Sequence, residues 1–124
     1  MPDRRGMINV RFKNGETRHF KTLVGAYLVQ ADLSRRDLSG FDFTNADLTE
    51  CNFTRANLAG CNFTGANLTY AGLHRATLRG AIMRNAVLTY SRMARADLRG
   101  VDFRGTNFWK ADMTGSFSDG ATFS

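Results

Sequence analysis

Large apolar residues recur at every fifth position of this sequence. From Leu28 to Phe123, every fifth residue is Leu, Phe or Met, with Ser118 as the single departure, and the residue two positions earlier is small in nearly every repeat. A period of five matches neither the 3.6-residue period of a helix nor the two-residue period of a strand. A short period without insertions over most of the chain is typical of a solenoid, in which each repeat contacts only its neighbours.

A second period of twenty residues is superimposed on the first. The last residue of every fourth repeat is glycine at Gly40, Gly60, Gly80, Gly100 and Gly120. The last residue of another set is arginine at Arg35, Arg55, Arg75 and Arg95, followed by Gly115. Identities that recur at twenty residues as well as at five favour four repeats in each turn of the solenoid over three.

The repeats ADLSR, ADLTE, ANLAG, ANLTY and ADLRG resemble those of the pentapeptide-repeat family, and the resemblance extends over residues 26–124. It implies an all-β fold, a right-handed quadrilateral β-helix of about five coils in which four pentapeptides form the sides of each coil. In such a coil the large and the small residue point inward and the other three point outward. Asp or Asn before the large residue is expected to hydrogen-bond the local backbone.

The two ends of the chain differ from the repeats and from each other. Residues 1–25 alternate around Asn14-Gly15, which predicts a β-hairpin that caps the first coil of the 26–124 solenoid. The last coil has no comparable cover, and we expect a homodimer through this apolar end. A frayed monomeric end is the alternative. The expected dimer residues are Phe103, Phe108, Trp109, Met113, Phe117 and Phe123.

The positive charge of the chain is concentrated in its middle. The formal net charge is +6, and no acidic residue occurs between Cys51 and Ala96. Three arginine columns are predicted: Arg35, Arg55, Arg75 and Arg95; Arg79 and Arg99; Arg84 and Arg104. An anionic partner accounts for such columns, although a small protein also needs some net charge to stay in solution.

No motif indicates catalysis, a metal or a cofactor. The sequence lacks nucleophile-elbow, P-loop and zinc-protease motifs, and the Asp residues have a structural explanation in the repeat. Cys51 and Cys61 occupy equivalent inward positions and are interpreted as buried free thiols. No apolar stretch is long enough for a membrane span or a signal peptide. We therefore expect a cytoplasmic protein that is not an enzyme.

Three functions compete, and the sequence favours the first, with the second as the alternative and the third behind both. The first is a rigid binding or scaffold module that contacts a protein partner through its flat faces and its C-terminal end. The second is binding of nucleic acid or another polyanion through the arginine columns, without base readout. The third comes from the resemblance, because some pentapeptide-repeat proteins mimic DNA and bind DNA gyrase. Mimicry of this kind requires an acidic surface, and the basic middle of this chain disfavours it.

Overall fold

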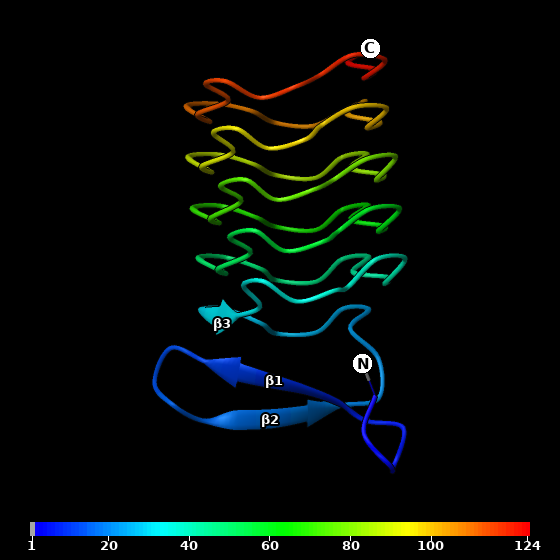
Figure 1. Cartoon of the computed structure of the whole chain (residues 1–124), viewed down its shortest axis with the longest axis vertical. Helices are drawn as coiled ribbons and strands as arrows, with labels where there is room; N and C mark the ends of the chain where they lie inside the picture. Colours follow the sequence, from blue (N-terminus) through cyan, green and yellow to red (C-terminus); the bar gives the residue numbers. More distant parts are fainter. Residues whose placement is uncertain (1) are drawn as a thin grey trace.

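A computed structural model describes residues 2–124 and consists of a stack of similar coils above a hairpin (Figure 1). Parallel bridges join residues twenty positions apart, from Tyr27–Asp47 at one end to Asp102–Thr122 at the other. The backbone N–H of Leu28 donates to the carbonyl of Asp47 at 2.8 Å, and the same bond recurs through the solenoid. The right-handed quadrilateral β-helix implied by the family resemblance is confirmed, as are the four repeats per turn that the two sequence periods favour.

Each side of a coil ends in a turn that requires an unusual backbone conformation. The carbonyl of the large residue accepts a hydrogen bond from the N–H three positions later, as from Ala31 to Leu28 at 3.0 Å. The residue at the third position of this turn has a positive φ, as in type II turns. Glycine adopts this conformation freely, as at Gly40 with a φ of 75°, but Arg75 adopts it too, with a φ of 57°.

The interior of the coils holds the large residue and the small residue of each repeat. Phe43 stacks on Phe63 with ring centroids 4.9 Å apart, one coil above the other, and Phe53 meets both rings edge-on. The buried Cys51 and Cys61 thiols donate to backbone carbonyls, and burial raises the pKa of each to about 12. The interior is therefore a packed apolar column, and its cysteines occupy the inward position that alanine takes in other repeats.

The Asp and Asn residues before the large residues hold the turns. In every repeat with Asp or Asn at this position, the side-chain oxygen accepts a bond from the backbone N–H two residues later, as at Asp32, where Ser34 donates at 3.1 Å. This is the Asx turn, which these side chains favour because they are short and polar. The predicted hydrogen bonding to local backbone is confirmed.

A hairpin closes the N-terminal end of the stack. Strand β1 (Ile8–Phe12) pairs antiparallel with β2 (Thr17–Phe20) on one side and with β3 (Ala31–Asp32) of the first coil on the other. Val10 and Phe12 are buried against the first coil. Arg36 occupies an otherwise small inward position, and its guanidinium donates to the Asn9 carbonyl of the cap at 2.7 Å.

The ladder begins slightly before residue 26. Leu23 lies in the core, and the N–H of Gly25 donates to the Thr44 carbonyl at 2.8 Å. The connection between hairpin and solenoid is therefore already part of the stack. Within residues 2–124 no helix forms that is long and apolar enough to cross a membrane.

Candidate anion-binding site

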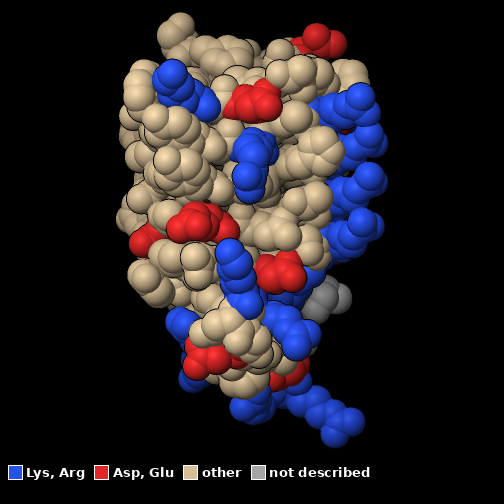
Figure 2. Space-filling model, turned by 90° about the vertical axis from the view of Figure 1, so that its left-hand side faces the viewer, with Lys and Arg blue, Asp and Glu red and all other residues tan. Residues whose placement is uncertain are grey.

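Four arginines stack at one corner of the solenoid, and we call them the Arg corner: Arg35, Arg55, Arg75 and Arg95. Each is the turn residue with positive φ, and neighbouring coils place them about 4.8 Å apart. Figure 2 shows a row of cationic side chains along one edge of the molecule. Among residues 2–124, no carboxylate lies within ion-pair distance of any of the four.

The other two arginine columns are built differently, because each shares one carboxylate. Asp97 accepts from Arg79 of the coil below at 2.8 Å and from Arg99 of its own repeat at 2.7 Å. Asp102 accepts in the same way from Arg84 at 2.6 Å and from Arg104 at 2.9 Å. We call these two groups the clamped columns. The sequence predicted three similar columns of arginines. In the structure, Asp97 and Asp102 partly neutralise the charge of two of them.

The electrostatics of the clamped columns follow from this geometry. The side chains of Asp97 and Asp102 are each only 18 % exposed. Hydrogen bonds from Arg99 hold the pKa of Asp97 well below its usual range, and bonds from Arg104 and Arg84 do the same for Asp102. Both carboxylates therefore stay ionised and keep their arginines engaged.

The Arg corner ends in a hollow at the last coil. Gly115 takes the place of a fifth arginine, and a pocket of about 520 Å³ opens there beside an exposed ring, Phe117. The pocket is lined by Arg55, Arg75, Arg95, Gly115 and Phe117. A volume of this size is typical of small-ligand sites.

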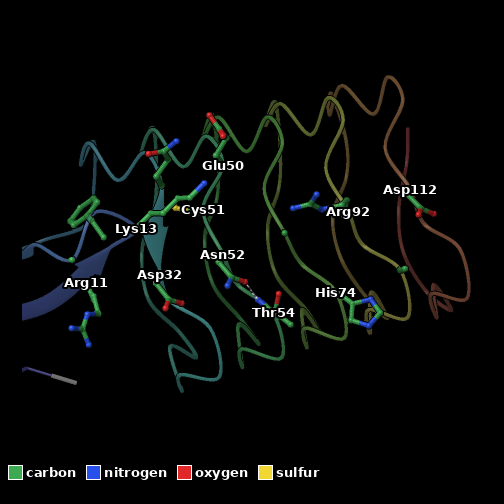
Figure 3. Close-up of a pocket in the computed structure, with 16 residues that line it drawn as sticks. Arg11, Lys13, Asp32, Glu50, Cys51, Asn52, Thr54, His74, Arg92 and Asp112 are labelled. Carbon is green, nitrogen blue, oxygen red and sulfur yellow. Dashed lines mark hydrogen bonds between the residues drawn. The ribbon is translucent and has the colours of Figure 1, made fainter.

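A longer groove of about 890 Å³ runs along one face of the solenoid (Figure 3). Arg11 and Lys13 lie at its cap end and Asp112 at its other end. Gly72 lies in the middle of the groove and contributes no side chain to it. The Arg92 guanidinium lies 3.7 Å from the position that a Cβ of residue 72 would occupy. Cations and carboxylates alternate along this groove, so it lacks the single sign of the Arg corner.

Three exposed aromatic side chains lie together on the surface of the upper coils. Tyr70 and Tyr90 stack with ring centroids 4.9 Å apart, and Trp109 meets Tyr90 edge-on at 5.4 Å. In the structure they form one continuous row, because they lie on successive coils and on adjoining positions of the last one.

The six residues predicted for a dimer end face do not share one surface. Phe103 is fully buried one coil below the end, stacked on Phe123 at 5.2 Å. Trp109 and Phe117 occupy outward positions and point sideways, each 59 % exposed. Only Phe108, Met113 and Phe123 present inward-type side chains at the end itself, and we call these three the end face. The position of each residue within the repeat distinguishes the outward Trp109 and Phe117 from the inward residues.

Within residues 2–124, no three His, Cys, Asp or Glu side chains gather as a metal site. His19 lies in the hairpin beside Asn9, and His74 lines the groove. The Asp residues of the repeats that precede a large residue are engaged in turns, and Asp97 and Asp102 also in arginine clamps.

Fold and surface together define a class of protein: a four-sided β-solenoid with a capped N-terminal end and a basic corner. The family of pentapeptide repeats matches with 8 copies over residues 26–65, 46–85 and 81–117. The chain therefore belongs to the pentapeptide-repeat family. A comparison with curated protein sequences found no match.

Solved structures of the same family give the extent of the likeness. The pentapeptide-repeat protein Rfr23 of the cyanobacterium Cyanothece 51142 is 30 % identical, with a TM-score of 0.74 over 75 % of this chain and 64 % of that one. A pentapeptide-repeat protein of the Arabidopsis thaliana thylakoid lumen is 36 % identical, with a TM-score of 0.75 over 76 % of this chain and 66 % of that one. This chain thus spans just under two thirds of either.

A third structure shares the fold alone. A trypsin-treated variant of QnrB1, a plasmid-mediated fluoroquinolone resistance protein, is 22 % identical, with a TM-score of 0.54 over 80 % of this chain and 60 % of that one. The likeness supports the solenoid architecture and carries no partner over to this chain.

Proposed function

We propose that this protein is a rigid, non-enzymatic binding module whose Arg corner engages the phosphates of a nucleic acid without reading its bases. One observation carries the proposal: the Arg corner has no carboxylate partner within residues 2–124, whereas the clamped columns do. A guanidinium forms paired hydrogen bonds with phosphate oxygens, and its charge persists at any physiological pH. The corner is therefore available to an external anion.

The geometry of the corner supports an extended anion over a point-like one. The arginines project from consecutive coils, and backbone ladder bonds fix each position, such as Arg55 N–H to the His74 carbonyl at 2.9 Å. A linear row at about 4.8 Å spacing suits a polymer that carries charge along its length. It also argues against DNA mimicry, which requires the opposite charge.

The test is a fluorescence-anisotropy titration with nonspecific duplex DNA at low and at physiological salt. The test variant replaces Arg55, Arg75 and Arg95 with Gln, and the control replaces Arg79, Arg99 and Arg104 with Gln. Both variants change net charge by the same amount, and circular dichroism checks that both fold.

We expect the test variant to lose at least about tenfold in affinity at low salt, while the control loses much less. Equal losses would mean that net charge, and not the corner, determines binding. A polyglutamate chain that competes as well as DNA would assign the corner to an acidic protein instead and overturn the nucleic-acid proposal.

The end face carries a second candidate function, contact with a protein partner. Phe123 is 48 % exposed although it is an inward-type residue, and Phe108 and Met113 lie beside it only partly covered. We propose a second copy of the chain as the occupant, related by a two-fold axis. Sedimentation of a Phe108→Asp, Phe123→Asp double variant tests this, since loss of a dimer is expected and an unchanged mass contradicts it.

A further inference from the structure

Two exceptions to the repeat pattern meet at the last coil beside the Arg corner. Gly115 stands where the four coils below carry arginine, and Phe117 stands where they carry Asp37, Asn57, Thr77 and Asp97. The first exception removes a side chain, and the second adds an exposed aromatic ring, 59 % exposed. Both line the pocket of about 520 Å³, together with Arg55, Arg75 and Arg95.

We propose that this pocket binds a phosphorylated nucleoside, with its phosphates on Arg75 and Arg95 and its base against the ring of Phe117. The inference rests on the proposed function, because it uses the same arginines, and it adds a defined ligand class and a base-contacting residue. Free nucleotides and the phosphorylated end of a nucleic acid strand share this chemistry.

The missing side chain at Gly115 provides the room. A Cβ built there would lie 3.3 Å from Cγ of Arg95, so the Arg95 side chain already passes close over this position. A fifth arginine would fill the pocket and continue the row. Its absence leaves the guanidinium end of the corner open on the side that faces Phe117.

The backbone of Phe117 is held in place by the solenoid ladder. Its N–H donates to the Ala96 carbonyl at 3.0 Å, and its carbonyl accepts from Leu98 at 2.7 Å. The guanidinium of Arg99, held by Asp97, lies 6.0 Å from the ring centroid. An exposed aromatic ring beside cations combines the two contacts that nucleotides use, stacking of the base and charge pairing of the phosphates.

The experiment compares ATP with inorganic tripolyphosphate by isothermal titration calorimetry on the full chain. Both carry three phosphates, so the difference between them reports the nucleoside part. We expect ATP to bind about tenfold tighter to the unmodified protein, which lies within the range measured for stacking of one base. Equal affinities for the two would overturn the inference.

Two variants locate the difference. Phe117→Thr restores the residue type found at Thr77, and it should reduce ATP affinity to that of tripolyphosphate without changing the latter. Gly115→Arg should remove the advantage of ATP and strengthen tripolyphosphate binding. The backbone accepts this arginine, because Arg75 and Arg95 adopt a similar φ at the same corner, 57° and 59°. The exposed side chain of Arg95 has to shift slightly, because the new Cβ would lie 3.3 Å from its Cγ. An ATP advantage that persists in both variants would place the base elsewhere and overturn the inference.

Oligothymidylate with and without a 5′-phosphate separates the two sources. A tenfold gain from the 5′-phosphate, for a strand whose affinity Phe117→Thr lowers, assigns the pocket to a strand end. ATP that binds at least as tightly as the phosphorylated strand assigns it to free nucleotides. Duplex DNA binding should be unchanged by Phe117→Thr, so the failure of this inference remains distinct from failure of the Arg corner as a whole.

Discussion

The Arg corner and the clamped columns look alike as columns of sequence, yet they offer different surfaces. Both stack arginines on successive coils, but Asp97 and Asp102 each engage two arginines of the clamped columns. At the Arg corner, the residue two positions before each arginine is the large inward residue of the repeat and not an Asp. A solenoid thus sets the spacing of charges by its coil, while an Asp two residues before an arginine, or eighteen residues after it on the next coil, decides whether its charge remains available.

The largest expected effect is on the salt dependence of nucleic-acid binding. Each arginine that contacts a phosphate contributes about −0.9 to the slope of log affinity against log salt. Single Arg→Gln changes at Arg55, Arg75 and Arg95 should each make the slope shallower by about this amount. Anisotropy titrations at four or more salt concentrations measure it.

Arg79→Gln is the matched control, since Arg79 is already engaged by Asp97. A slope that changes as much for Arg79 as for Arg75 would erase the distinction between the Arg corner and the clamped columns.

The comparison can also be reversed by opening a clamp. Asp97→Asn keeps the turn, as Asn57 does with the Ala59 N–H at 3.1 Å, but it releases Arg79 and Arg99. We expect duplex DNA affinity to rise several-fold, with a slope steeper by up to about 0.9 for each released arginine.

Asp37→Asn provides the control, because it causes the same change in net charge on the same face. Within residues 2–124 the Asp37 carboxylate bonds to Ser39 and Asn57 and to no arginine. An equal gain from both variants would show that net charge accounts for the effect.

Much of this molecule could be predicted from its sequence, because the periods of five and twenty specify the coil and the inward positions. The clamps could not be found by comparing residues twenty apart, since Arg79 and Asp97 are eighteen apart. An Asp two residues before an Arg, as in Asp97 and Arg99, was the available signal. The sideways direction of Trp109 and Phe117 also followed from their place in the repeat, whereas the stacking of Tyr70 on Tyr90 depends on rotamers.

A third test concerns the cost of placing arginine at a corner. Arg75 and Gly80 occupy equivalent turn positions with φ of 57° and 67°. A residue with a side chain is disfavoured there by about 1 kcal/mol relative to glycine. Arg75→Gly should therefore stabilise the protein by about 1 kcal/mol, and Gly80→Arg should destabilise it by a similar amount.

Urea unfolding measures both changes, and the m-value checks that the unfolding remains comparable. No heavy atom lies within 4 Å of a Cβ built on Gly80, so the arginine introduced there has room. If Arg75→Gly instead destabilises the protein, the aliphatic stems of the corner arginines contribute to the fold, and the corner is structural.

The smallest expected effect is a contribution to the pH dependence of stability that the clamped columns make and the Arg corner does not. The pKa of Asp97 is lowered from its ordinary value of 3.8 by hydrogen bonds from Arg99, and that of Asp102 is lowered from 3.8 by bonds from Arg104 and Arg84. A carboxylate with a lowered folded-state pKa stabilises the fold above its unfolded pKa, and this contribution disappears as pH falls through the folded value. The free energy of unfolding from urea titrations should thus differ between the unmodified protein and an Asp97→Asn, Asp102→Asn variant at pH 6, and the difference should shrink as pH falls below 3.8.

Arg75→Gln should show no such convergence, because no carboxylate within residues 2–124 pairs with Arg75. A difference that stays constant down to pH 2 would mean that the clamped carboxylates titrate as they do in the unfolded chain. The two kinds of arginine column would then differ in geometry but not in electrostatic coupling.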